Sequence, residues 1–176
     1  MSPLSIDNFK IETERLILRP FTPNDLDNFA LICADPEVMR FIGNGKPLNQ
    51  EAVKGLLTGI ISQYEELGFG LLAVTLKENN QLLGFCGLIR QIVDEEPHIE
   101  LGYRLARAFW NKGIATEAAQ SIKDYAFNQL NIANLVSIIH VDNMASKRVA
   151  QKVGLIHIKT THFKEKLVDV YFIKNG

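Results

Sequence analysis

The stretch HIELGYRLARAFWNKGIATEAAQSIKDYA, from His98 to Ala126, has the pattern of a strand, a short turn and a helix that opens at Gly113. Small and apolar residues recur at helical spacing and mark the buried face of that helix: Ala115, Ala118, Ala119, Ile122 and Ala126. The first N–H groups of a helix lack a helical partner and lie at the positive end of its dipole, so such a turn suits a phosphate group. Many helices begin after a glycine, so the turn alone is a weak indication of a ligand.

Length and composition fit one domain spanning residues 1–176. Hydrophobic residues make up 47% and charged residues 22% of the chain, which is ordinary for a soluble globular protein. The net charge of −1 and the lack of a basic block do not indicate a nucleic-acid partner. No stretch approaches the ~20 apolar residues of a membrane span, and the N-terminus lacks a signal-peptide run. We therefore expect a cytoplasmic protein that binds neither nucleic acid nor membrane.

Strand and helix patterns alternate along the rest of the chain. The expected elements are a strand over Thr13–Phe21, a helix from a Thr22 cap to about Asp35, a helix from an Asn49 cap to Leu67, strands over Phe69–Leu76, Leu82–Gln91, His98–Leu105 and Leu135–Val141, a helix from Asp142-Asn143 to Gly154, and a closing hairpin of Leu155–Phe163 and Leu167–Ile173. The run LVSIIHV at Leu135 is almost continuously apolar, which is typical of a strand in parallel pairing that is covered on both faces. Gly43–Pro47 is predicted to be a flexible connector, and Asp94–Pro97 an acidic surface turn.

Two motifs resemble one known family. The stretch around Trp110–Ala115 is similar to the acetyl-CoA-binding motif of the GNAT superfamily, Arg/Gln-x-x-Gly-x-Gly/Ala, with Gly113 and Ala115 in place and Trp110 where Arg or Gln is usual. The segment Asp142–Ser146, followed by Lys152-Val153-Gly154-Leu155, resembles the family's second segment. The likeness is strongest to the branch of ribosomal-protein N-terminal acetyltransferases.

The resemblance implies a fold and a cosubstrate. The fold is a single α/β (α+β) domain, whose mixed and mostly antiparallel sheet contains two parallel strands that splay apart and is flanked by helices. Acetyl-CoA would lie in that wedge, between the strand of Glu100 and the strand ending at Asp142. Its pyrophosphate would meet the turn formed by Trp110, Asn111, Lys112, Gly113, Ile114, Ala115 and Thr116. Backbone N–H groups around Leu105 would polarise the thioester carbonyl.

Asn143 has two readings. Its side chain is a candidate N-cap for the following helix, which by itself explains the residue. The resemblance adds a contact with the pantetheine arm of the cosubstrate. Both roles can hold together.

Glu100 is the candidate general base. By strand alternation it shares a face with His98, Gly102 and Arg104, so one reading is a carboxylate paired with Arg104 on an exposed face. The other reading is catalytic, because an α-amine titrates near ~7.7–8.0 and a lysine near ~10.4, so an acceptor amine must lose a proton before it attacks. Several GNAT enzymes resemble this chain in having a glutamate at that point.

Ser146 is the candidate partner of the leaving thiolate. The resemblance places a tyrosine acid at the position of Ala150, so the usual acid is missing and Ser146 is the nearest substitute. The alternative is a first-turn serine that only satisfies helix N–H groups. A thiol ionises near ~8.5, so the thiolate leaves tolerably without an acid.

These observations predict an acetyl-CoA-dependent N-acetyltransferase that acts on a primary amine, with a protein N-terminal α-amine as the first choice. A small amine (polyamine, amino acid or aminoglycoside) and a non-catalytic CoA-binding module are the alternatives. The histidines and the two cysteines show no metal spacing, so no metal is expected. A monomer or a homodimer is expected.

Overall fold

The fold is built on one mixed sheet, described by a computed structural model for residues 8–176. The eight strands lie in the order β1-β2-β3-β4-β5-β6-β8-β7. Their bounds are β1 Ile11–Glu12, β2 Leu16–Arg19, β3 Leu71–Leu76, β4 Leu82–Val93, β5 Glu96–Leu105, β6 Asn134–His140, β7 Ile156–Phe163 and β8 Lys166–Lys174. Every neighbouring pair is antiparallel except β5 and β6, which are parallel. The expected mixed, mostly antiparallel sheet is confirmed.

Five α-helices and two short 3₁₀ turns connect the strands in the described part of the chain. Their bounds are η2 Pro23–Asp25, α1 Leu26–Cys33, α2 Pro36–Met39, α3 Gln50–Leu67, η3 Arg107–Phe109, α4 Ile114–Asn128 and α5 Met144–Val153. The side chain of Asn49 accepts a hydrogen bond from Ala52 N (2.8 Å), and α3 ends at Gly68, whose φ is +71°. Both ends of this helix follow the expected capping chemistry.

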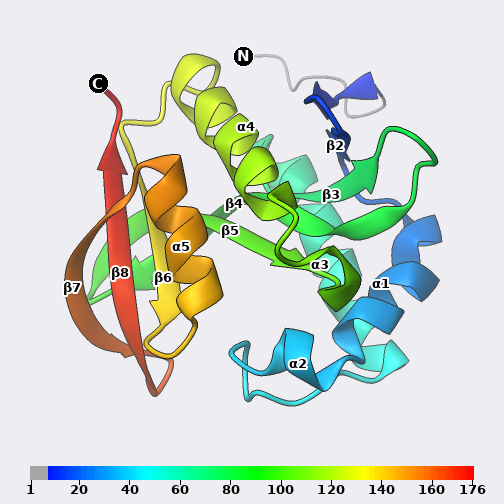
Figure 1. Ribbon diagram of the computed structural model, residues 1–176, viewed down its shortest axis with the longest axis horizontal. Helices are drawn as coiled ribbons and strands as arrows, with labels where there is room; N and C mark the ends of the chain where they lie inside the picture. Colours follow the sequence, from blue (N-terminus) through cyan, green and yellow to red (C-terminus); the bar gives the residue numbers. More distant parts are fainter. Residues whose placement is uncertain (1–7) are drawn as a thin grey trace.

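Helices cover both faces of the sheet (Figure 1). On one face, α4 and α5 pack with Leu101 and Leu105 of β5 in the larger apolar core. On the other face, α1 and α3 pack with Phe85 of β4 in a second core. Because side chains alternate along a strand, Glu100, Gly102 and Arg104 lie on the α1–α3 face of β5.

The expected first strand, Thr13–Phe21, is shorter in the structure, where β2 spans Leu16–Arg19, and the short strand β1 precedes it. The hydroxyl of Thr13 accepts a hydrogen bond from Leu16 N (3.0 Å), and Thr13 N donates to Leu16 O (3.0 Å), which closes a tight turn. β1 and β2 pair across this turn with Ile11 opposite Leu18. Because the Thr13 side chain takes part in the backbone hydrogen bonds of this turn, the strand begins at Leu16, later than strand propensity indicates.

The acidic turn is shorter than expected. Only Asp94 and Glu95 lie between β4 and β5, and both have positive φ, 50° and 68°. Two residues with φ > 0 form the hairpin turn whose twist matches that of the flanking strands, so pairing continues to the Val93–Glu96 pair.

The sheet opens between β5 and β6. Their register contains the single pair Glu100–Val136, whereas β5 and β4 pair from Gly84–Leu105 to Val93–Glu96. Beside the opening, the buried hydroxyl of Ser137 donates to Leu101 O (2.8 Å). This side chain satisfies a backbone carbonyl that β6 would otherwise pair with through its own backbone. The expected splay of two parallel strands is present.

Candidate active site

A cleft of about 250 Å³ lies at the splay. Its walls come from the segment after α2 (Phe41, Ile42, Gly43), β4 (Phe85, Ile89, Gln91), β5 (Glu100, Leu101, Gly102, Tyr103, Arg104), β6 (Ser137, Ile138, Ile139, His140), the start of α5 (Asn143, Ser146), and the β7–β8 hairpin (Phe163, Lys164, Lys166, Val168). Phe41 reaches β6, where its ring lies 5.1 Å from that of His140. Phe41 and Ile42, which precede the connector predicted over Gly43–Pro47, and its first residue Gly43 therefore form one wall of the cleft.

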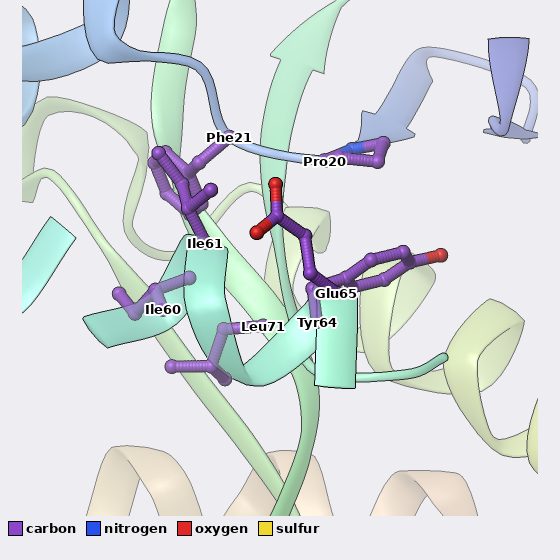
Figure 2. A pocket seen from close by; sticks show the side chains of 7 residues that line it. All are labelled: Pro20, Phe21, Ile60, Ile61, Tyr64, Glu65 and Leu71. Atoms are coloured by element: carbon purple, nitrogen blue, oxygen red, sulfur yellow. The ribbon is translucent and has the colours of Figure 1, made fainter. Parts of the chain in front are cut away.

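A second hollow lies between α3 and the segment that follows β2 (Figure 2). It has a volume of about 20 Å³ and is lined mainly by apolar side chains, with the Glu65 carboxylate between Pro20 and Phe21. Such a space holds about one water molecule. None of the candidate residues lines it, so we place the candidate site in the larger cleft.

Glu100 lies where the parallel pairing ends. Gln91 Nε2 donates to Glu100 Oε2 (2.8 Å). Burial raises the pKa of Glu100, and hydrogen bonds from Gln91 and the Ile138 backbone, with the charge of Lys164, only partly oppose that rise. A carboxyl group with a raised pKa is a stronger base than an ordinary one.

Arg104 is not the partner of Glu100 in the described residues. Its Nη1 lies 3.5 Å from Cys33 Sγ, and its guanidinium lies over the Phe85 ring at 4.8 Å. Two residues four apart on a strand are separated by about 13 Å between Cα atoms, since each residue advances ~3.3 Å. The exposed Glu100–Arg104 pair considered from the sequence is therefore absent within residues 8–176.

The backbone of β5 presents amides to the opening. Ala106 N donates to Leu83 O (2.8 Å), which sets the phase of the antiparallel ladder. Because hydrogen-bonded residues alternate along such a ladder, the backbone groups of Tyr103 and Leu105 are directed away from β4 and toward the β6 side. The carbonyl of Leu105 accepts a hydrogen bond from Trp110 Nε1 (2.9 Å), and its N–H is directed to the open side.

The turn before α4 exposes the start of that helix. Gly113 is the N-cap with φ of +74°, and no side chain caps the helix there. The first helical bond runs from Glu117 N to Gly113 O (3.0 Å), so the N–H groups of Ile114, Ala115 and Thr116 precede it. The side chain of Ile114 is buried in the core, so only its backbone is available to a ligand.

Two residues far away in sequence hold this turn in place. Arg15 donates through Nε to Glu117 (2.7 Å) and through Nη1 to Lys112 O (2.9 Å), and Thr13 Oγ1 donates to Glu117 (2.6 Å). Burial acts to raise the pKa of Glu117, but these hydrogen bonds outweigh it and hold the pKa below the usual value. The pairing spans 102 residues, and no local pattern in the sequence signals it.

Asn143 caps α5, because its side chain accepts a hydrogen bond from Ser146 N (3.2 Å). The Ser146 hydroxyl has no hydrogen-bond partner within residues 8–176, so the capping work considered for it belongs to Asn143. Tyr103 donates its hydroxyl to Ser146 O (2.6 Å) and ties β5 to α5 across the splay. No pattern in the sequence indicates this link, because Tyr103 and Ser146 are 43 residues apart.

Ala150 is 1% exposed and belongs to the larger core, so the position where the family has a tyrosine is filled by packing here. No group of three or more His, Cys, Asp or Glu side chains that could hold a metal occurs in the described residues. Over the same residues, none of the helices combines the length and apolar character that crossing a membrane requires.

Comparison with known proteins identifies the family. Residues 15–156 match the model of the acetyltransferase (GNAT) domain. The chain is 34% identical over 167 residues to the Bacillus subtilis (strain 168) protein YkkB, covering 92% of this chain and 94% of that protein. It is 30% identical over 164 residues to the N-acetyltransferase p20 of Bacillus licheniformis, covering 90% and 91%. An acetyltransferase structure from Agrobacterium tumefaciens is similar with a TM-score of 0.80 and 27% identity, covering 98% of each chain.

Two further similarities carry names that describe a reaction. RimL, a ribosomal alpha-N-protein acetyltransferase solved in complex with coenzyme A, superimposes with a TM-score of 0.79 at 17% identity over 94% of this chain and 98% of that one. An Aspergillus fumigatus protein named FsC-acetyl coenzyme A-N(2)-transacetylase is 29% identical over 157 residues, covering 85% of this chain and 66% of that protein. The family match covers most of the chain, and the fold of the chain is that of solved acetyltransferases. The chain therefore belongs to the GNAT acetyltransferase family and is an N-acetyltransferase.

Proposed function

We propose that the enzyme transfers the acetyl group of acetyl-CoA to a primary amine, with a protein N-terminal α-amine as the preferred acceptor. The observation that carries the proposal is the position of Glu100, at the single parallel pair of a splayed sheet and in the wall of a cleft. On the other face of the sheet lie α4, whose start is uncapped, and α5, whose first residues reach the cleft through Asn143 and Ser146.

The residues of that opposite face suit acetyl-CoA as the second substrate. The N–H groups of Ile114, Ala115 and Thr116 and the positive end of the α4 dipole would bind its pyrophosphate, which takes the place of the missing cap. The outward amides of β5, with Leu105 among them, would bind the pantetheine arm and polarise the thioester carbonyl. Trp110, Asn111 and Lys112 form the turn that leads into α4, and Asn143 would contact the arm while it caps α5.

Glu100 would remove the proton that blocks the amine. An α-amine is mostly protonated near neutral pH, since its pKa is about 7.7–8.0. The raised pKa of Glu100 brings the proton acceptor closer to the donor in strength, directly or through a water molecule. The neutral amine then attacks the thioester, and no acetyl-enzyme is required.

Ser146 would stabilise the departing thiolate. Its hydroxyl is free of partners in the described residues, and the residue lines the cleft at the start of α5. A neutral hydroxyl donating to a developing charge supports departure without a proton transfer.

The acceptor is ranked by resemblance. Support for a protein N-terminus comes from the motif likeness to the ribosomal-protein branch and from the fold likeness to RimL. The FsC-acetyl coenzyme A-N(2)-transacetylase name supports a small-molecule amine as the second candidate.

An acceptor screen tests the proposal. Purified enzyme and acetyl-CoA are mixed with peptides of varied N-termini, amino acids, polyamines and an aminoglycoside, and free thiol is followed. We expect rapid thiol release with at least one N-terminal peptide and little with the same peptide after N-terminal blocking. Binding of acetyl-CoA without amine-dependent thiol release would instead identify a CoA-binding module.

A further inference from the structure

Arg104 is a cation without an anionic partner. Its guanidinium meets the Cys33 thiol and the face of Phe85, its Nε is buried without a hydrogen-bond partner, and no carboxylate of residues 8–176 pairs with it. Burial lowers the pKa of Arg104, so holding its charge there costs free energy that these neutral neighbours recover only in part. An anion from outside the chain would complete the site.

The position of Arg104 excludes the cosubstrate phosphates as that anion. Leu105 and Leu101 pack against α4 and α5, so Arg104 projects from the opposite face of β5. The uncapped start of α4 belongs to the first face. Arg104 lies in the wall of the cleft on the face where Glu100 also lies.

The floor between the two charged residues is apolar. Gly102 has no side chain there, and Ile89 Cδ1 lies 3.1 Å from the place that a Cβ of Gly102 would take. Glu100 and Arg104 stand at the two ends of that floor, about 13 Å apart at Cα at ~3.3 Å per residue. A small acceptor can therefore present its amine to Glu100 and a second group to Arg104.

Apart from Glu100, the other charged residues of the cleft are positive, as Arg104 is. Lys164 and Lys166 line it from the β7–β8 hairpin, and neither forms a salt bridge within residues 8–176. Glu100 is the sole carboxylate among the lining residues. Such a cleft attracts an anionic acceptor and disfavours polyamines and aminoglycosides.

We infer that the acceptor is an amine bearing an anionic group a few bonds away, and that Arg104 binds this group while Glu100 meets the amine. This inference rests on the proposed function and narrows its substrate class. The carboxylate can belong to an acidic residue at a protein N-terminus or to a free amino acid. A guanidinium–carboxylate pair with two parallel hydrogen bonds would fix the orientation of the amine.

The test compares acceptors that differ only in the charge of one group. C-terminally amidated peptides that begin with Ser-Glu or Ser-Gln form one arm, and free amino acids and their C-terminal amides form the other. Affinity is measured by calorimetry on enzyme saturated with coenzyme A, and kcat/KM is measured by thiol release. We expect the anionic member of at least one arm to bind about 10- to 150-fold more tightly, the effect of one hydrogen bond to a charged group. The arm that shows the preference identifies the source of the carboxylate.

Arg104→Gln should abolish this preference while coenzyme A affinity stays near that of the original enzyme. Arg90→Gln is the matched control, because Arg90 lies on the neighbouring β4 over Phe69 and does not line the cleft. Equal affinity for the charged and neutral members in the original enzyme would overturn the inference, as would a preference that persists in Arg104→Gln. The proposed function fails separately, when no acceptor of any charge is acetylated.

Discussion

Glu100 and Arg104 share one face of β5 but differ in how their charges are satisfied. Glu100 receives a hydrogen bond from Gln91, whereas Arg104 has only a thiol and an aromatic ring. The sequence predicted their common face from alternation. It did not predict what surrounds each, because Gln91, Cys33 and Phe85 reach them through sheet register and helix packing. Glu100 was found through a family resemblance, and Arg104 was considered only as its partner.

Replacing Glu100 by Gln should lower kcat by ~10²–10⁴-fold, the usual contribution of a general base. Acetyl-CoA affinity should stay near normal, since Glu100 lies on the acceptor face. The raised pKa of Glu100 places the acid limb of the rate–pH profile above the usual carboxylate range. In the variant this limb should vanish or move up toward the ionisation of the amine itself. Near-native turnover at neutral pH would leave Glu100 with a structural role.

Replacing Ser146 by Ala should lower kcat by about 10- to 150-fold, since one hydrogen bond to a charged group is worth about 1.5–3 kcal/mol. The loss should shrink with an acyl donor whose thiol has a lower pKa. The melting temperature should change little, because Asn143 supplies the cap of α5. A variant that loses stability and keeps turnover would contradict a role in catalysis. Ala150→Tyr should not restore the missing acid, because Ala150 is 1% exposed and the added ring would overpack the core.

At the scale of elements, local chemistry predicted most of the fold. The capped helices α3 and α5, the apolar strand β6 and the glycine-led α4 follow from propensity, capping and periodicity. The start of the first strand was wrong because a side chain redirected the backbone at Thr13. The contact of Phe41 with His140 joins segments distant in sequence, and no local pattern could predict it. The turn before α4 combines both cases. Gly113 could be identified in the sequence as the start of α4, whereas the hydrogen bond from Arg15 to Lys112 O that holds the turn could not.

Gly113→Val should weaken coenzyme A binding and leave the fold intact. The reason is backbone conformation, because φ is +74° and a Cβ there would meet only Arg15 Nη2, at 3.5 Å. A β-branched residue resists that φ, at a cost on the order of 1–3 kcal/mol, and would reorient the first amides of α4. Calorimetry with coenzyme A and circular dichroism measure the two effects.

Gly68→Val is the control for that strain. Gly68 has φ of +71° at the end of α3, and a Cβ there meets nothing within 4 Å. It should lose similar stability and keep its affinity for coenzyme A. Equal affinity loss in both variants would show that Gly113 acts through general stability.

At the scale of the whole molecule, carboxylates with lowered pKa values join different elements of the fold. Glu117 joins α4 to the β1–β2 turn, and Asp169 of β8 accepts a salt bridge from Lys147 of α5 at 2.6 Å. Asp25, which is 6% exposed, pairs with Arg19 of β2 at 2.8 Å. For all three, burial raises the pKa, and the hydrogen bonds and cations lower it further than burial raises it.

Stability should therefore fall in acid. A lowered carboxyl pKa contributes stability that is complete above the unfolded values of 3.8 for Asp and 4.5 for Glu and is lost as pH falls through the folded values. Urea unfolding at pH 7 and at pH 3 should show the loss. Asp25→Asn should cost about 1–3 kcal/mol at pH 7 and reduce the difference between the two pH values. Asp124→Asn, on an exposed part of α4, should leave both unchanged. An unaltered pH response in Asp25→Asn would contradict this assignment.

The splay between β5 and β6 leaves an opening, here called the window, in a sheet that otherwise separates the two layers of helices. Donor and acceptor, as proposed, arrive from opposite sides and meet only at the window, so neither lies in the other's path to solvent. Both substrates can then be present together, either can bind first, and each product can leave by the side from which its parent came. Because the two walls are separate, a substitution in the acceptor wall can change which amine is accepted without altering the wall that binds the donor.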